Sequence, residues 1–186
     1  MALSFANKVT IARILAVPFF IIVLLYYLPS REYLRLVALG IFLLAVISDV
    51  IDGYIARTRH QKTKAGSILD PVADKFLLIS AFICLYKIGS LLGPIKFPLW
   101  VVLIVISRDV ILLIGSMIIY MVHGDLNIVP TRWGKATTFF QILCVIGILM
   151  QWDFSFVFWY CAVLLTVISG VGYIRTGIKV LNVAPG

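Results

Sequence analysis

Charged side chains are scarce in this chain. Only 13% of the 186 residues are charged, while 62% are hydrophobic and the mean hydropathy is +1.10. A soluble domain is usually about half apolar and about a quarter charged. The composition therefore excludes an ordinary soluble domain. It predicts an integral membrane protein with a single transmembrane domain over residues 1–186.

Cysteine is also rare, which excludes two further classes of protein. The three cysteines, Cys84, Cys144 and Cys161, are odd in number and lie far apart in apolar runs. They form neither a disulfide framework nor a cysteine metal motif, and we interpret them as packing residues. The formal net charge of +8 is interpreted as basic residues that set the orientation of the chain in the membrane and contact anionic lipids. No basic stripe alternates with aromatic residues, so we expect no nucleic-acid partner.

Long apolar runs occupy most of the sequence. A membrane-spanning helix needs about 20 mostly apolar residues. Short polar breaks, or breaks that contain proline or glycine, separate six such runs. The sequence therefore predicts an all-α bundle of six transmembrane helices, over residues 9–28, 34–56, 69–89, 98–121, 135–151 and 155–177.

Basic residues are divided unequally between the two ends of this predicted bundle. If both termini share one side, that side holds Lys8, Arg57, Arg59, Lys62, Lys64, Arg132, Lys135, Arg175 and Lys179. The opposite side holds only Arg31, Arg35, Lys87 and Lys96. The positive-inside rule then places both termini in the cytoplasm, and we expect the chain in the inner (plasma) membrane of a bacterium.

Acidic residues are few, and half of the eight lie between residues 49 and 74. Asp49 and Asp52 are three positions apart and Asp70 and Asp74 are four apart, so each pair shares one helix face. Carboxylates beside hydrocarbon usually serve a metal, a proton or a substrate. Converging carboxylates suit a hard divalent cation, so we expect Mg²⁺ or Mn²⁺, with two ions, at the cytoplasmic membrane boundary.

Small residues and one arginine surround these aspartates. Gly53, Ala56 and Gly66 leave space for a bulky ligand to approach the backbone. Arg57 offers a planar fork of donors for phosphate oxygens. The residues themselves therefore predict a site that binds a pyrophosphate and a metal and opens onto lipid.

The same window resembles the signature D-x2-D-G-x2-A-R-x8-G-x3-D-x3-D of the CDP-alcohol phosphatidyltransferase family, and it matches every fixed position. The resemblance implies a homodimeric helical bundle with a polar active-site cavity open to the cytoplasm. It also implies a transferase reaction on CDP-diacylglycerol. The hydroxyl of an acceptor alcohol attacks the lipid-side phosphorus, and CMP leaves.

The resemblance also implies a role for each matched position. Asp49, Asp52, Asp70 and Asp74 resemble the metal ligands, and Asp74 additionally resembles the general base that is the catalytic residue. The resemblance places the CDP-lipid pocket at Asp52, Gly53, Ala56, Arg57 and Gly66.

The start of the first predicted span resembles one branch of this family. The motif P-N-x-x-T-x-x-R is typical of phosphatidylglycerophosphate and cardiolipin synthases, and here Ala6 replaces the proline. The resemblance implies that Asn7 and Thr10 bind the CDP-lipid from the membrane surface. The alternative is that both residues cap the N-terminus of a helix at the interface.

The acceptor is predicted from residues outside the signature. Arg108, Lys135 and Thr138 are the candidate acceptor-binding residues; the alternative for Arg108 is an ion pair with Asp109, although adjacent helical side chains pair poorly. Phosphatidylglycerophosphate synthases typically carry a second arginine after the one that corresponds to Arg108, and a second lysine after the one that corresponds to Lys135. At these two places this chain has a Gly-Ser pair and Thr137. Fewer cations favour a singly charged acceptor. We therefore expect phosphatidylglycerol as acceptor and cardiolipin as product, with glycerol 3-phosphate as the alternative.

Two other classes of membrane protein also place aspartates within the membrane. An ion-coupled transporter is a distant alternative, but it usually shows paired halves or broken helices, which this sequence lacks. A UbiA-type prenyltransferase uses aspartate pairs with Mg²⁺, but the spacing of small residues around Arg57 is not its pattern.

Overall fold

In the computed structural model, residues 5–58, 64–92, 97–123 and 132–182 are described. Within these ranges, the structure describes no side chains at 5–10, 52–58, 64–72, 74, 116, 118–123, 132, 174 and 176–182. The described residues form helices joined by turns and contain no strand. The predicted all-α class is confirmed.

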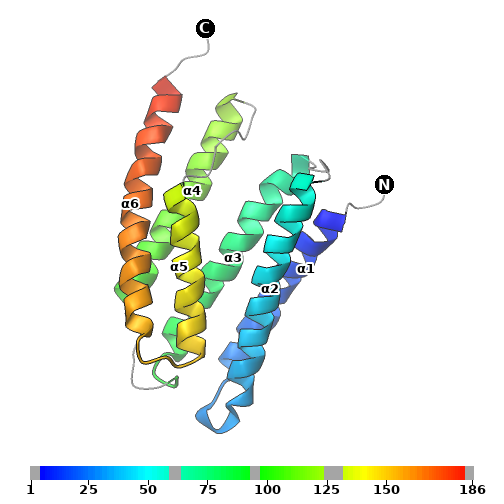
Figure 1. Cartoon of the computed structure of the whole chain (residues 1–186), viewed down its shortest axis with the longest axis vertical. Helices are drawn as coiled ribbons and strands as arrows, with labels where there is room; N and C mark the ends of the chain where they lie inside the picture. The colour runs from blue at the N-terminus through cyan, green and yellow to red at the C-terminus, as the bar shows by residue number, and fades with distance from the viewer. Residues whose placement is uncertain (1–4, 59–63, 93–96, 124–131, 183–186) are drawn as a thin grey trace. The chain divides into compact units, whose positions relative to one another are not determined.

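Six α-helices follow one another in the described part of the chain, and each corresponds to one predicted apolar segment (Figure 1). A short 3-10 helix, η1 (Pro29–Arg31), precedes the second of them. The α-helices are α1 (Phe5–Leu25), α2 (Tyr33–Thr58), α3 (Lys64–Ile88), α4 (Leu99–His123), α5 (Arg132–Leu149) and α6 (Ser155–Asn182). Several of them begin before the predicted apolar segment, because helical hydrogen bonds continue through polar residues that hydropathy leaves out.

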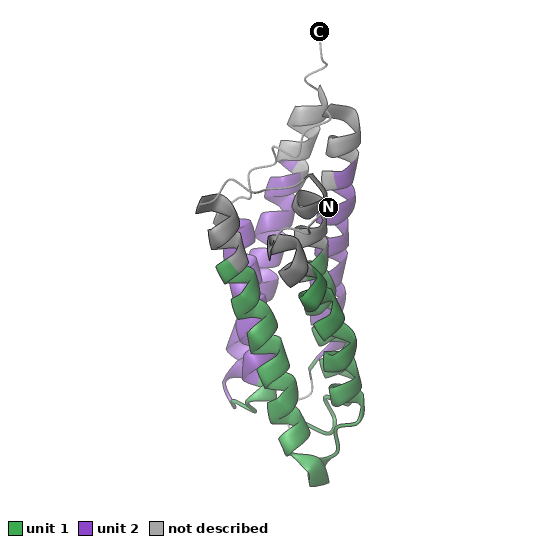
Figure 2. Ribbon diagram, turned by 90° about the vertical axis from the view of Figure 1, so that its right-hand side faces the viewer, with its two compact units in different colours: residues 1–97, 148–152 green, residues 98–147, 153–186 purple. Residues whose placement is uncertain are grey.

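The chain divides into two compact units (Figure 2). Unit 1 comprises residues 1–97 and 148–152, and unit 2 comprises residues 98–147 and 153–186. Within unit 1, α1 packs against both α2 and α3; within unit 2, α4 packs against α6. The prediction of one transmembrane domain over the whole chain stays a prediction.

Aromatic packing sets the register between α1 and α2 in unit 1. The rings of Phe20 and Phe42 lie 5.9 Å apart between centroids, and both side chains are fully buried. Burial of two such rings supplies a large apolar contact area. Because consecutive helices joined by a short connection run antiparallel, residues that precede Phe20 come to lie opposite residues that follow Phe42.

A pair of long polar side chains holds residues 148–152 within unit 1. Nη1 of Arg35 donates to the carbonyl oxygen of Leu149 at 2.7 Å, and Nε2 of Gln151 donates to that of Leu92 at 2.7 Å. Gln151 has a φ of 56°, the left-handed conformation that often follows the last turn of a helix. These contacts satisfy carbonyl groups that the helix end and the turn leave without helical partners.

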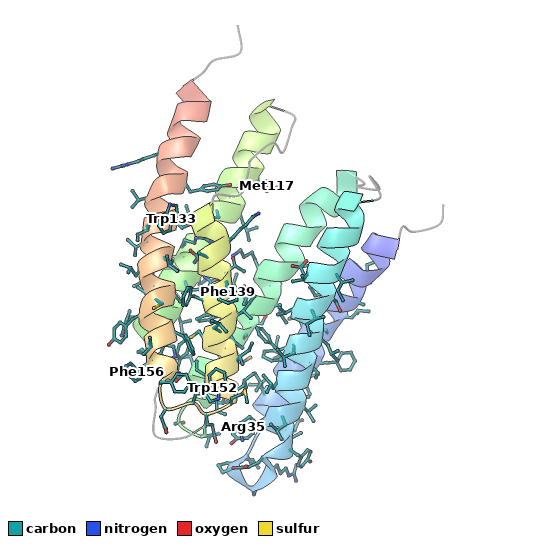
Figure 3. All side chains as sticks on the ribbon, viewed as in Figure 1. Arg35, Met117, Trp133, Phe139, Trp152 and Phe156 are labelled. Atoms are coloured by element: carbon teal, nitrogen blue, oxygen red, sulfur yellow. The ribbon has the colours of Figure 1, made fainter. Side chains whose placement is uncertain are left out.

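Apolar side chains cover much of the exposed surface of the helices, among them Met117, Trp133, Phe139 and Phe156 of unit 2 (Figure 3). Among the described residues, Tyr33–Ile51 and Ser155–Tyr173 are long and apolar enough to cross a membrane. Only 17% and 28% of their most apolar windows are buried. A core helix of a soluble protein would be mostly covered, so these exposed apolar faces are consistent with a membrane protein.

Candidate active site

The predicted site residues around the aspartates lie on three helices of unit 1. Asp49 and Asp52 are on α2 and Asp70 and Asp74 are on α3, and both helices pack against α1. Of the four carboxylates, the structure describes only that of Asp49; the side chains of the other three lie outside the described residues. The same holds for the side chains of the other predicted CDP-lipid residues, whose backbone is on α1, α2 and α3: Asn7, Thr10, Gly53, Ala56, Arg57 and Gly66.

The described carboxylate, that of Asp49, forms an ion pair across two helices. Nη1 of Arg13 on α1 lies 2.9 Å from Oδ1 of Asp49 on α2. The arginine side chain is only 2% exposed, whereas the aspartate side chain is 41% exposed. A buried guanidinium requires a counter-ion, and Asp49 supplies it while it stays accessible to a ligand.

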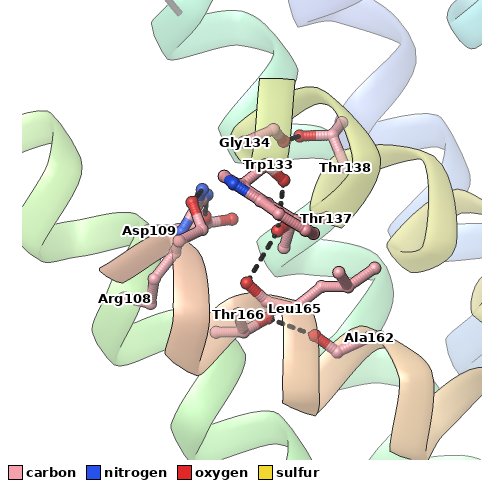
Figure 4. A network of polar contacts seen from close by, with 10 residues as sticks. Arg108, Asp109, Trp133, Gly134, Thr137, Thr138, Ala162, Leu165 and Thr166 are labelled. Atoms are coloured by element: carbon pink, nitrogen blue, oxygen red, sulfur yellow. Dashed lines mark hydrogen bonds and ion pairs between the residues drawn. The ribbon is translucent and has the colours of Figure 1, made fainter. Parts of the chain in front are cut away.

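In unit 2, Arg108 on α4 forms a second buried cluster (Figure 4). Its Nη1 donates to Oδ1 of Asp109 at 2.7 Å, and its Nη2 donates to Oγ of Ser169 on α6 at 2.6 Å. Arg108 and Ser169 are buried, and Asp109 is fully buried. The expectation that the neighbours Arg108 and Asp109 pair poorly is wrong, because the long arginine side chain turns back to the carboxylate.

The other two acceptor-binding candidates lie at the start of α5. Lys135 is exposed, and Oγ1 of Thr138 donates to the carbonyl oxygen of Gly134 at 3.2 Å. Between them, Thr137 is fully buried, and its hydroxyl hydrogen is shared between the carbonyl oxygens of Trp133, at 2.9 Å, and Leu165, at 3.1 Å (Figure 4). Thr137 therefore joins α5 to α6 at the position where the family motif has a lysine.

A groove of about 370 Å³ lies along α4 and α6 in unit 2. Most of its lining is apolar, and its polar members are Ser107, Arg108 and Thr166. Because apolar side chains dominate, this groove is not the predicted polar cavity. That cavity stays a prediction.

Two contacts of the candidate site were not predicted from the sequence. The sequence gives Arg13 as a cation within an apolar run but does not identify Asp49 as its partner. It likewise does not identify Ser169 as a partner of Arg108. A charge within a membrane helix does signal that a partner exists. The identity of that partner depends on helix register, which spacing within one helix cannot supply.

Comparison with known proteins identifies the family. The sequence model of the CDP-alcohol phosphatidyltransferase family matches residues 3–168. The chain belongs to the CDP-alcohol phosphatidyltransferase family, as its aspartate signature predicts.

Its relatives carry names from one reaction class. The chain is 31% identical over 182 residues to a probable phosphatidylglycerophosphate synthase of Mycobacterium tuberculosis, covering 95% of this chain and 82% of the relative. It is 33% identical over 182 residues to the CDP-diacylglycerol–glycerol-3-phosphate 3-phosphatidyltransferase of Haemophilus influenzae, covering 95% and 91%. The enzyme of the same name from Aquifex aeolicus is 30% identical over 184 residues, covering 94% and 96%. The family and these relatives indicate a transferase of phospholipid biosynthesis.

Proposed function

We propose that this chain transfers the phosphatidyl group of CDP-diacylglycerol to the hydroxyl of glycerol 3-phosphate and releases CMP. The observation that carries the proposal is the likeness, over more than nine-tenths of the chain, to enzymes named for that reaction. These names favour glycerol 3-phosphate over the phosphatidylglycerol that the sequence motifs led us to expect.

The donor side of the reaction is assigned to the aspartates of α2 and α3. Carboxylate oxygens on two helices that share α1 as a neighbour suit a hard divalent cation, and Asp49 keeps an accessible carboxylate. We assign Asp49, Asp52, Asp70 and Asp74 to hold Mg²⁺ or Mn²⁺. The cation, when bound, neutralises charge on the pyrophosphate and stabilises CMP as the leaving group.

The remaining roles follow the family signature. Asp74 takes the proton from the acceptor hydroxyl as that oxygen attacks the lipid-side phosphorus. Arg57 binds the pyrophosphate, and Gly53, Ala56 and Gly66 leave room for the nucleotide, with Asn7 and Thr10 at its edge. We further propose a homodimer in the inner membrane, with both termini and the active site facing the cytoplasm.

The acceptor side is assigned to Arg108, Lys135 and Thr138. A phosphomonoester carries nearly two negative charges and is best bound by several cationic donors. Lys135 is exposed and can reach an acceptor phosphate. Arg108 is buried but is among the residues that line the groove along α4 and α6, so an acceptor phosphate would approach it through that groove.

Two observations favour a second candidate, transfer to phosphatidylglycerol to give cardiolipin. Asp109 and Ser169 already bind the two terminal nitrogens of Arg108. Thr137 is neutral and buried at the position of the motif's second lysine. Both features reduce the positive charge available to the acceptor, and a phosphodiester needs less of it.

An acceptor assay separates the two candidates. Purified protein is given CDP-diacylglycerol together with glycerol 3-phosphate, phosphatidylglycerol, serine or inositol in separate reactions, and the lipid product is identified by mass. We expect a lipid product only with glycerol 3-phosphate, and we expect that product to be phosphatidylglycerophosphate. Cardiolipin from phosphatidylglycerol would establish the second candidate. If no acceptor leads to release of CMP, both candidates are wrong.

A further inference from the structure

The position of Arg13 follows from the packing of α1 against α2. Phe20 and Phe42 contact each other across this pair of antiparallel helices. Arg13 precedes Phe20 by two helical turns, and Asp49 follows Phe42 by two turns. At about 3.6 residues per turn, both residues return to the faces that carry the aromatic contact. The register that buries the two rings therefore also brings Arg13 to Asp49.

The two partners of this ion pair are buried to different extents. Arg13 has almost no exposed surface, so its charge is desolvated, whereas Asp49 keeps two-fifths of its side chain exposed. A carboxylate has about four lone-pair sites on its two oxygens. One contact to Nη1 of Arg13 leaves most of them available, while the buried partner fixes where the carboxylate lies.

We propose that Arg13 is a positioning residue for Asp49. The buried guanidinium holds Oδ1 of Asp49 on the α1 side and leaves the other oxygen for a divalent cation. That Arg13 fixes the position of the Asp49 carboxylate follows from the ion pair alone. That this carboxylate binds a cation rests on the proposed function. Groups that orient a metal ligand usually change metal affinity by about 10- to 100-fold when they are removed.

Two simpler roles for Arg13 make different predictions. If the arginine acted only through its positive charge, its removal would strengthen the binding of a cation. If it only anchored α1 to α2, its removal would lower stability and leave cation affinity unchanged. If Arg13 positions Asp49, its removal should weaken cation binding. That is the opposite of what the first role predicts, and the second role predicts no change in cation affinity.

The test measures Mn²⁺ binding by electron paramagnetic resonance on purified protein in detergent, with no lipid substrate. We expect Arg13→Met to raise the Kd for Mn²⁺ by about tenfold. Arg13→Lys, which keeps a charge and one donor group of similar reach, should give an intermediate Kd. An Arg13→Met protein that binds Mn²⁺ as tightly as the wild type, or more tightly, would overturn the inference.

Arg35 provides a matched control on α2, the helix that carries Asp49. Like Arg13 it is a mostly buried arginine, but it contacts Glu32 and the carbonyl oxygen of Leu149. It lies about 21 Å from Asp49 along the helix axis, at about 1.5 Å per residue. Arg35→Met should lower the unfolding temperature without changing the Kd for Mn²⁺.

A second measurement tests the ion pair without any metal. In metal-free protein, we expect Asp49→Asn to lower the unfolding temperature by about 5 °C, because it leaves a buried arginine without this partner. In the Arg13→Met background the same change should have little effect. Independent, additive losses would overturn the inference. Coupled losses in a protein that binds no Mn²⁺ would support the fixed carboxylate and refute the metal of the proposed function.

Discussion

Two buried arginines among the described side chains are neutralised in different ways. Arg13 meets a half-exposed carboxylate on a neighbouring helix, whereas Arg108 meets the buried carboxylate of the next residue and a serine on another helix. Removal of Arg13 leaves Asp49 partly solvated. Removal of Arg108 takes from Asp109, which is fully buried, the guanidinium nitrogen that lies 2.7 Å from its Oδ1.

Replacement of Arg108 should therefore affect both binding and stability. We expect Arg108→Ala to raise the KM for the acceptor by about tenfold or more, the effect of losing a hydrogen bond to a charged group. It should also lower the free energy of unfolding by about 3 kcal/mol, since a buried carboxylate loses its ion pair with Arg108. Steady-state kinetics with each substrate varied in turn, and thermal unfolding, measure the two effects.

Ser169→Ala is the matched control for Arg108→Ala. It removes one hydrogen bond from the guanidinium but keeps the charge, so the unfolding free energy should fall by only about 1 kcal/mol. If Arg108→Ala raises the KM for CDP-diacylglycerol alone, Arg108 belongs to the donor pocket and its assignment to the acceptor is wrong.

Asp74 is the residue on which the chemistry of the proposal depends. We expect Asp74→Asn to lower kcat by about 10²- to 10⁴-fold, the usual contribution of a positioned general base. Binding of Mn²⁺ and of CDP-diacylglycerol should persist, because the amide keeps one oxygen ligand. Asp153→Asn, at an exposed aspartate between α5 and α6, should leave the rate unchanged. A wild-type rate in the Asp74 variant would remove the general-base assignment.

At the scale of the helices, a buried threonine hydroxyl connects α5 to α6. Oγ1 of Thr137 reaches the carbonyl oxygen of Leu165 on α6. By contrast, Oγ1 of Thr166 bonds the carbonyl oxygen of Ala162 within its own helix, at 2.6 Å. The two buried threonines therefore separate the effect of an interhelical hydrogen bond from that of an intrahelical one.

Thr137→Val should lower the free energy of unfolding by about 0.6–1 kcal/mol, the usual value for a hydrogen bond between membrane helices. Thr166→Val should lower it by less, because that hydroxyl only adds to a carbonyl already engaged in its helix. Unfolding in detergent by a graded denaturant measures both variants. Equal losses would show that the contact to Leu165 contributes nothing.

Hydropathy predicted all six helices but placed the first residue of several of them too late in the chain. The third predicted span begins at residue 69, whereas α3 begins at Lys64 and so includes Gly66. A window of apolar residues marks the part that suits hydrocarbon, while the helix continues through its polar first turns. Helix spacing also grouped the aspartates into pairs. The contact between Arg108 and Ser169 joins residues 61 positions apart, so it requires the tertiary packing of α4 on α6.

For the molecule as a whole, the exposed apolar helices require a lipid or detergent environment. We expect the protein to stay in the membrane pellet after an alkaline carbonate wash, since transmembrane helices are not released by disrupting electrostatic contacts. Immunoblots of the pellet and the supernatant measure this. Recovery in the wash would contradict the assignment of α2 and α6 as membrane spans.

The proposed metal site makes a prediction for the intact enzyme. Because the aspartates of α2 and α3 would lack the cation that we propose they hold, we expect activity to vanish with EDTA and to return with excess Mg²⁺ or Mn²⁺. Addition of Zn²⁺-free Mg²⁺ after gel filtration controls for loss of a different metal. Phosphatidyl transfer that resists the chelator would contradict the site.

The contacts of Arg35 and Gln151 bear on how the protein can be dissected. The first three helices are continuous in sequence and resemble a separable fragment, yet a polypeptide that stops at Phe97 would lack residues 148–152. The guanidinium of Arg35 would lose the Leu149 carbonyl, and the Leu92 carbonyl would lose its amide donor. Attempts to express the aspartate-bearing half alone should therefore yield a less stable product than coexpression with the remainder of the chain.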